Sequence, residues 1–285
     1  MSAASLYIVA TPIGNLQDIS LRAIEVLRQV DLIAAEDTRH SAKLLKHYGI
    51  TSPLMALHEH NEQARIEHCL QNLKEGRSLA LITDAGTPLI SDPGFQLVRA
   101  ARQAGLTVSP VPGPSAITAA LSCAGLPSDS FIFAGFLPAK QAGRLKKLES
   151  FSGEIRTMIF YEAPHRIVDT LHDMQTVFSP QRRAVLAREM TKAHETFLAD
   201  TLENLLERLS QDANQQRGEM VLLLEGDSEE KSAPLKEVTV QPDWLMKILL
   251  EELPLKQASA LAAKISGLKK NSLYQIGLQL KESND

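Results

Sequence analysis

The chain has 285 residues, of which 44% are hydrophobic and 22% are charged, and its formal net charge at pH 7 is −4. This length and composition predict an ordinary globular protein of one large or two medium domains with a sizeable core. The small negative charge excludes attraction of nucleic acid by overall charge, so RNA contact requires local basic surfaces.

The two cysteines, Cys69 and Cys123, lie far apart and have no metal-like spacing. They argue against a disulfide framework and for a reducing, cytosolic compartment. The first residues lack a basic segment followed by an apolar core, so we expect no signal peptide. No apolar run is long enough to cross a bilayer. We therefore expect a cytoplasmic protein that binds no membrane.

The first half of the chain alternates apolar runs with amphipathic segments. Strands are predicted at residues 6–10, 31–35, 54–57, 79–82 and 107–111. Helices are predicted at residues 20–30, 40–48, 61–74, 95–104 and 115–124. Such alternation is typical of a mostly parallel sheet covered by helices.

A second alternating half follows. Strands are predicted at 131–136, 157–161, 184–188 and 220–224, and helices at 140–151, 165–178 and 202–209. A polar stretch then precedes three short helices at 244–253, 255–265 and 272–280. The predicted organisation is an N-terminal α/β lobe (1–125), a C-terminal α/β lobe (126–227), a linker (228–241) and a small helical module (242–285).

The stretch from Asp84 to Gly94, DAGTPLISDPG, directly follows the buried run at 79–82. Its glycines and prolines cannot continue a strand and suit sharp turns with unusual backbone angles. A buried strand, such a loop and a helix place a ligand beyond the carboxyl end of a parallel sheet. A mere tight connection is the alternative interpretation.

Two other cofactor classes lack their motifs. No G-x-G-x-x-G follows a strand and no G-x-x-x-x-G-K-[ST] occurs, which argues against a dinucleotide oxidoreductase and a P-loop NTPase. His58 and His60 alternate as metal ligands can, but no partner follows at finger-like spacing. We favour polar loop residues there and expect no metal.

Separate motifs occur along the whole chain: TPIGN (11–15), EDTR (36–39), DAGTPLISDPG (84–94), PGPSA (112–116), GFLPAK (135–140), FYEAPHR (160–166), ARE (187–189), GEMV (218–221) and KKNSLY (269–274). With these motifs the chain closely resembles the ribosomal RNA methyltransferases of the tetrapyrrole methylase superfamily. The resemblance implies two α/β lobes of the tetrapyrrole methylase type with S-adenosyl-L-methionine in the cleft between them, plus a small C-terminal helical module.

The resemblance also implies a reaction and partners. The reaction is methylation of the ribose 2′-hydroxyl of one cytidine in the decoding region of 16S ribosomal RNA, within the 30S subunit. A homodimer is implied as well. Two other functions stay open: a tetrapyrrole C-methyltransferase on the same fold, and a non-catalytic ribosome-assembly factor that retains a cofactor pocket.

The cofactor-binding residues that the resemblance assigns lie in several loops: Pro12, Gly14, Asp84, Ala85, Gly86, Thr87, Leu89, Ile90, Ser91, Ser115, Ala116, Tyr161, Gly218, Glu219 and Met220. Backbone N–H and C=O groups of such loops suit the neutral and singly charged groups of S-adenosylmethionine.

A ribose hydroxyl is a weak acid, so a nearby group should accept its proton during attack. Polar side chains compete for this role: Glu162, His165, Glu189, Lys192 and Glu195. We assign Glu162, Glu189 and Lys192 to the catalytic site. Each also has a structural interpretation; Glu162, for example, can pair with Arg166 one helical turn away.

Basic residues are predicted to contact RNA in three places: Arg39, Lys140, Arg144, Lys147, Lys269 and Lys270. The middle three fall on one face of the helix predicted at 140–151. The alternatives are an ion pair that orients a loop, a solvated helix face and a packing or dimerisation appendage.

Overall fold

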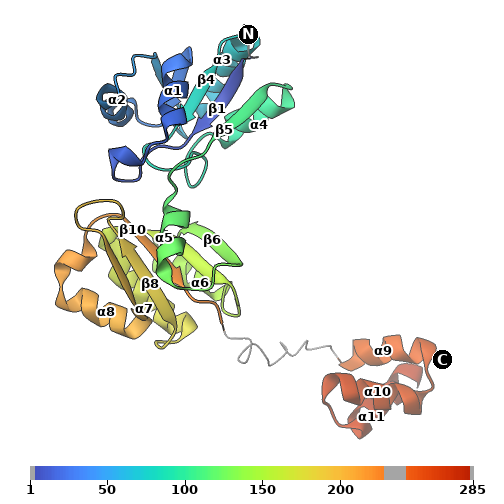
Figure 1. Cartoon of the computed structure of the whole chain (residues 1–285). Coiled ribbons are helices and arrows are strands. Elements are labelled where there is room, and N and C mark those ends of the chain that lie inside the picture. Colours follow the sequence, from blue (N-terminus) through green and yellow to red (C-terminus); the bar gives the residue numbers. More distant parts are fainter. Residues whose placement is uncertain (1–3, 228–241, 283–285) are drawn as a thin grey trace. The chain divides into compact units, whose positions relative to one another are not determined.

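The computed structural model describes residues 4–227 and 242–282, so the predicted linker at 228–241 lies outside the described residues. The chain divides into two compact units, residues 1–226 and 227–285, which Figure 1 shows as two bodies. The larger unit carries both sheets, each with helices on both faces. The predicted fold class of two α/β lobes and a helical module is confirmed.

The first sheet is parallel throughout and has the order β3-β2-β4-β1-β5. Its strands are β1 (Ser5–Val9), β2 (Leu32–Ala35), β3 (Leu54–Ala56), β4 (Leu79–Ile82) and β5 (Thr107–Val111). All four residues of β4 are buried, because alternate side chains enter the cores on opposite faces of the sheet.

Two helices cover each face of the first sheet. The helices α1 (Leu21–Gln29) and α2 (Thr38–His47) share one core with Ala80 and Ile82 of β4. The helices α3 (Glu62–Lys74) and α4 (Phe95–Gln103) share the opposite core with Leu79 and Leu81. Figure 1 shows the two pairs on either side of the strands.

The second sheet is mixed and has the order β6-β7-β10-β8-β9. Its strands are β6 (Phe131–Phe136), β7 (Thr157–Glu162), β8 (Arg183–Arg188), β9 (Thr196–Thr201) and β10 (Met220–Leu224). Only β6 and β7 pair in parallel; the other neighbours are antiparallel. Strand β9 was not predicted, because this half-buried edge strand pairs with β8 alone and its sequence TFLADT lacks an apolar run.

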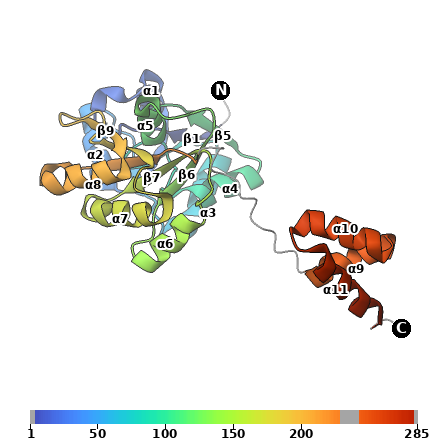
Figure 2. The same cartoon turned by 90° about the horizontal axis from the view of Figure 1, so that it is seen from below.

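One face of the second sheet packs on α6 (Gln141–Glu149), α7 (Ile167–Phe178) and α8 (Leu202–Gln211). The other face packs on α5 (Ala116–Ala124), and Figure 2 shows α5 and α7 on opposite sides of β6 and β7. The helix predicted at 115–124, which is α5, was expected to belong to the first lobe (1–125). In the structure the chain has already crossed to the second lobe where α5 begins.

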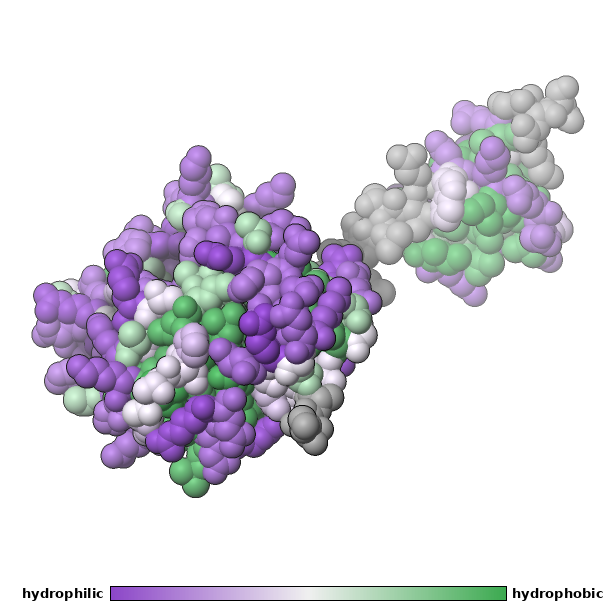
Figure 3. All heavy atoms as spheres, turned by 90° about the horizontal axis from the view of Figure 1, so that it is seen from above, coloured by the Kyte–Doolittle hydropathy of each residue, from purple (hydrophilic) through white to green (hydrophobic). Residues whose placement is uncertain are grey.

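The C-terminal unit consists of α9 (Pro242–Glu252), α10 (Leu255–Ser266) and α11 (Lys270–Glu282) around a small apolar core. A Cβ at Gly277 would lie 2.4 Å from Leu255 and 2.7 Å from Met246, so glycine allows α11 to pack closely. Large apolar side chains remain exposed on this unit: Trp244, Ile248, Leu261, Ile265, Leu268 and Tyr274. Figure 3 shows an apolar area on its visible face.

Short 3-10 helices lie at Leu16–Asp18, Pro164–Arg166 and Ala213–Gln216. Across the described ranges, no helix is both long enough and apolar enough to cross a membrane.

Candidate active site

Three loops of the first lobe meet at the carboxyl edge of the first sheet. They follow β1, β4 and β5, which are neighbours in the sheet. Thr11 and Gly86 exchange both backbone hydrogen bonds, at 2.9 and 3.0 Å. The Thr87 hydroxyl donates to the Pro114 carbonyl at 3.0 Å. The three loops are therefore tied into one wall.

The second lobe supplies the facing wall from the ends of β7 and β8 and the start of β10. The backbone N–H of Asn15 donates to Thr191 Oγ1 at 3.0 Å and so joins the two walls. A Cβ at Gly14 would lie 2.7 to 2.8 Å from Thr191, Lys192 and the Met190 carbonyl oxygen. Only glycine fits this close approach.

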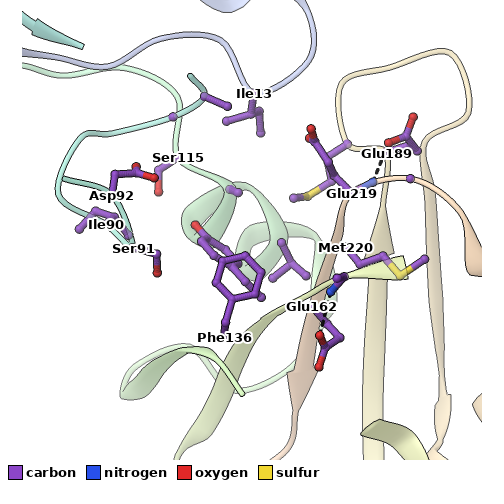
Figure 4. A pocket seen from close by; sticks show the side chains of 18 of the residues that line it. Ile13, Ile90, Ser91, Asp92, Ser115, Phe136, Glu162, Glu189, Glu219 and Met220 are labelled. Atoms are coloured by element: carbon purple, nitrogen blue, oxygen red, sulfur yellow. Dashed lines mark hydrogen bonds between the residues drawn. The ribbon is translucent and has the colours of Figure 1, made fainter. Parts of the chain in front are cut away.

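Between the walls lies a cavity of about 650 Å³, whose lining side chains Figure 4 shows from close by. Most predicted site residues line it: Ala85, Gly86, Thr87, Ile90, Ser91, Ser115, Ala116, Tyr161, Glu162, Glu189, Lys192, Gly218, Glu219 and Met220. Residues from segments more than a hundred positions apart are thus brought together, as the resemblance implied.

Four predicted cofactor residues do not line the cavity. Pro12 is buried behind it, and Gly14 serves the contact between the walls. Asp84 accepts a hydrogen bond from the Asp37 N–H at 3.3 Å. Leu89 packs into the core beneath the loop. These residues support the loops that reach the cavity.

Several lining residues were not predicted from the sequence: Ile13, Asp92, Phe136, Ala163, Pro164, Met190 and Val221. All seven stand within or beside the motifs that were recognised, so the motifs were the signal that could have found them. Their side chains were not distinguishable from neighbours without the contact between the lobes.

Lys192 is held by two carboxylates of the far wall. Its ammonium lies 2.8 Å from Glu189 Oε1 and 3.2 Å from Glu219 Oε2. Burial by itself would lower the Lys192 pKa, but the hydrogen bonds to Glu189 and Glu219 outweigh burial and raise it. The hydrogen bond from Lys192 lowers the pKa of Glu189. Lys192 is therefore a cation and Glu189 an anion.

Glu162 borders the cavity, but its side chain is fully buried at the end of β7. It accepts hydrogen bonds from the Ala163 N–H at 2.8 Å and the Thr170 hydroxyl at 2.7 Å. It also lies 3.2 Å from Arg166 Nε, the ion pair expected from the spacing. These contacts occupy both carboxylate oxygens and fix the start of α7.

Asp92 is a half-buried carboxylate on the first-lobe wall, and Figure 4 shows its side chain pointing into the cavity. Burial and the negative charge of Glu36 raise its pKa to about 7. The negative charge of Asp84 adds to this effect, while a hydrogen bond with Thr83 opposes it.

An aromatic wall stands opposite this carboxylate. Phe136 packs edge-to-face on Tyr161 with ring centroids 5.5 Å apart, and 56% of Phe136 is exposed. Burial and the charge of Asp92 raise the pKa of Tyr161 to about 12, so its hydroxyl is a neutral donor. This wall offers a flat apolar face beside polar groups.

The lining fits S-adenosylmethionine. The cavity volume lies in the range of about 300–1,000 Å³ usual for small-molecule sites. The carboxylates of Asp92, Glu189 and Glu219 suit a sulfonium and an ammonium group, and the aromatic wall suits a purine. Lys192 is the one cation among the described lining residues, enough for a single carboxylate but not for a polyphosphate.

The predicted RNA-binding residues fall into two groups. Arg144 is buried at 4% exposure and bonds Asp173 at 2.6 Å, so its prediction as part of an exposed basic face is wrong. Arg144 has the same helical spacing as Lys140 and Lys147, but its side chain is buried where α6 packs against α7. The other five are exposed: Arg39, Lys140, Lys147, Lys269 and Lys270.

The pair His58 and His60 belongs to no group of potential metal ligands in the part of the chain that the structure describes. His58 instead contacts Asn61, whose side-chain nitrogen lies 3.1 Å from its Nε2.

Comparison with known proteins agrees with this geometry. Residues 5–206 match the model of the tetrapyrrole (corrin/porphyrin) methylases, and residues 237–281 match the model of the RsmI C-terminal HTH domain. Solved structures share the fold: a diphthine synthase (TM-score 0.60, 16% identity, 79% of this chain and 91% of that chain), and a uroporphyrin-III C-methyltransferase from Thermus thermophilus complexed with S-adenyl homocysteine (TM-score 0.55, 16% identity, 78% and 97%).

Curated relatives are similar over nearly their whole length. Proteins named ribosomal RNA small subunit methyltransferase I are 56% identical in Haemophilus influenzae (96% of both chains) and 56% identical in Pseudomonas aeruginosa (98% of both). The one in Escherichia coli O157:H7 is 52% identical, over 98% of this chain and 96% of that one. The chain belongs to the tetrapyrrole methylases and, within them, to the ribosomal RNA small subunit methyltransferase I family. It is an S-adenosylmethionine-dependent methyltransferase.

Proposed function

We propose that the chain methylates the ribose 2′-hydroxyl of a cytidine in the decoding region of 16S ribosomal RNA. The observation that carries this proposal is the cavity between the lobes, lined by the motifs that the chain shares with its family. The names of the curated relatives support ribosomal RNA as the acceptor. S-adenosylmethionine, when bound, supplies an activated methyl group.

The lining residues then bind and orient. Backbone groups of the loop at 84–94 and residues Ser115, Gly218 and Met220 hold the cofactor. Lys192 binds a carboxylate, and Glu189 holds Lys192 in place at 2.8 Å. Alignment of the acceptor hydroxyl within such a rigid cavity contributes several kcal/mol to catalysis.

RNA contact falls to the exposed basic residues outside the cavity. Lys140, just before α6, and Lys147 on α6 are exposed, and Lys269 and Lys270 are exposed at the start of α11. The match of residues 237–281 to an HTH domain model supports a nucleic-acid contact for the C-terminal unit. We further propose a cytoplasmic homodimer that acts on the assembled 30S subunit.

A tritium-transfer assay tests the function. The purified chain is given labelled S-adenosylmethionine with 30S subunits, free 16S RNA or a tetrapyrrole. We expect label in RNA, most of it with 30S subunits. Label in the tetrapyrrole alone would establish the C-methyltransferase alternative, and binding to RNA without any transfer would establish the assembly factor.

A further inference from the structure

The structure points to Asp92 as the catalytic residue that accepts the proton of the attacking hydroxyl. Three observations carry this inference, which rests on the proposed function: the position of Asp92 in the cavity, the lack of an ion-pair partner for it among the described residues, and the negative charges of Glu36 and Asp84 that act on it. Asp92 lines the cavity from the first lobe, and Phe136 and Tyr161 line it from the second lobe.

The backbone of the loop holds Asp92 in this position. Leu89 and Ser91 have positive φ angles of 73° and 69°, a conformation that non-glycine residues rarely adopt. Leu89 packs into the core, while Ile90, Ser91 and Asp92 line the cavity. A strained turn thus directs three consecutive residues inward.

The other carboxylates that line the cavity are already committed. Glu162 is fully buried and bonded on both oxygens. Glu189 bonds Lys192 and also accepts the Glu219 N–H at 2.8 Å, and Glu219 is the second partner of Lys192. Among the described residues, the ion pairs include none with Asp92. Of the described lining carboxylates, Asp92 is therefore the one that neither pairs with Lys192 nor is fully buried.

The groups that act on Asp92 disfavour its charge. Burial and the negative charges of Glu36, which follows β2, and Asp84, which follows β4, disfavour the ionised form of Asp92, while a side-chain hydrogen bond with Thr83 favours it. Tyr161 faces it from β7 as a neutral phenol. With a pKa of about 7, the carboxylate is a far stronger base than an ordinary aspartate, and it is largely ionised in slightly alkaline solution.

The proposed step balances. The ribose oxygen bonds to the methyl carbon, the carbon–sulfur bond breaks with its electron pair on sulfur, and the hydroxyl proton passes to Asp92 Oδ. One positive and one negative charge disappear, leaving a methyl ether, a neutral thioether and a carboxylic acid. The acid then loses its proton to solvent.

If Asp92 is the base, the rate of methyl transfer depends on pH, and a change of charge near Asp92 shifts that dependence. Single-turnover methyl transfer by the wild type should rise with pH through about 7 and then level, because the ionised carboxylate is the active form. Glu36→Gln keeps a hydrogen-bonding partner for Thr83, which donates to Glu36 at 2.6 Å, but removes its charge. The acid limb should therefore move to lower pH.

The experiment combines this profile with a direct titration. Carbon-13 NMR of the cofactor-free chain, labelled at aspartate carboxyl carbons, should show one resonance that titrates near 7, is absent in Asp92→Asn and shifts to lower pH in Glu36→Gln. Asp92→Asn should also lower the transfer rate by at least about 100-fold and lose the acid limb. Asp129→Asn, at an exposed site outside the cavity, is the matched control and should match the wild type.

Two results would overturn the inference. One is a folded, cofactor-binding Asp92→Asn that keeps the wild-type rate and pH limb. The other is a Glu36→Gln that moves neither the resonance nor the limb, a readout that stands even where Asp92→Asn fails to fold. A wild type that transfers no methyl to ribosomal RNA would instead overturn the proposed function and the inference with it.

Discussion

Asp92 links the chemistry of the cavity to the stability of the fold. A carboxyl group whose pKa is raised in the folded chain binds its proton more tightly there than in the unfolded chain. The contribution of Asp92 to folded stability therefore falls as the pH rises from its ordinary pKa of 3.8 to about 7, and is constant above. The cavity keeps this unfavourable charge because the reaction uses it.

We therefore expect Asp92→Asn to raise the melting temperature, with a gain that grows from about pH 4 to about pH 7. Thermal unfolding of wild type and variant at intervals between pH 4 and 8.5 measures this difference. If the variant is no more stable than the wild type at pH 8, the ionised Asp92 does not destabilise the fold and its pKa is not raised.

Gly218 leaves room for the Glu189 side chain that holds Lys192, and this role can be tested by substitution. Its φ is +88°, and a Cβ there would lie 2.4 Å from Glu189 Cγ, so any side chain displaces the carboxylate that holds Lys192. We expect Gly218→Ala to weaken binding of S-adenosylmethionine on the order of tenfold, equivalent to about 1.4 kcal/mol. Calorimetric titration gives the affinity directly.

Gly76→Ala is the matched control. Gly76 has nearly the same φ, +86°, but a Cβ there meets nothing within 4 Å. Both variants place alanine in an unfavourable left-handed backbone conformation. Only Gly218→Ala also displaces Glu189 in the lining of the cavity. If Gly218→Ala and Gly76→Ala bind S-adenosylmethionine with equal affinity, Glu189 and Lys192 do not contribute to cofactor binding.

At the scale of elements, α6 and α7 are joined by a buried ion pair. Arg144 and Asp173 are both 4% exposed and bond at 2.6 Å, and Gln141 donates a further hydrogen bond to Asp173 at 2.9 Å. Asp173→Ala leaves a buried guanidinium uncompensated and should lower the free energy of unfolding by about 3–5 kcal/mol. Denaturant unfolding measures it.

Asp169→Ala, at an exposed position of the same helix, should cost far less, within about 1 kcal/mol. Losses of similar size in the two variants would mean that solvent screens the buried pair. The ion pair also explains why helical spacing alone misassigned Arg144: periodicity places a residue on a face, but does not say which face meets a neighbouring helix.

The first sheet was predictable because its strands are short, largely apolar runs that alternate with helical segments; LALI at 79–82, which is buried at every position, is the clearest. The second sheet was less so. Its antiparallel pairings leave no trace in the individual strands, and β9 is an edge strand with polar residues. The packing of α5 on the second sheet also depends on tertiary contacts that its small apolar residues do not specify.

The site divides in the same way. Most lining residues of the loop at 84–94 were predictable because one local motif carries them. Phe136 and Asp92 come from different lobes, and their importance arises only where the lobes face each other. The pKa of Asp92 depends on its burial and on the charges of Glu36, just after β2, and Asp84, at the start of the same loop. A sequence pattern does not show how burial and these charges combine at Asp92.

At the scale of the whole molecule, the C-terminal unit offers Lys269 and Lys270 as exposed cations. Replacing both by glutamine should weaken RNA binding and lower the slope of log affinity against log salt by up to about two units. Cofactor affinity should not change, because the cavity is complete within the larger unit. Filter binding at several salt concentrations measures the slope.

The charge control is Lys74→Gln, at an exposed position near the end of α3. An unchanged slope in the double variant, with an unchanged melting temperature, would assign the C-terminal unit a role other than gripping RNA.

The methylation of 16S ribosomal RNA in cells tests the proposed function and the role of Asp92 most directly. Mass spectrometry of digested 16S ribosomal RNA should show one 2′-O-methylcytidine of the decoding region missing in cells that lack this chain. The wild-type gene should restore it, and a gene carrying Asp92→Asn should not. An intact methyl group in the cells without the chain would contradict the account.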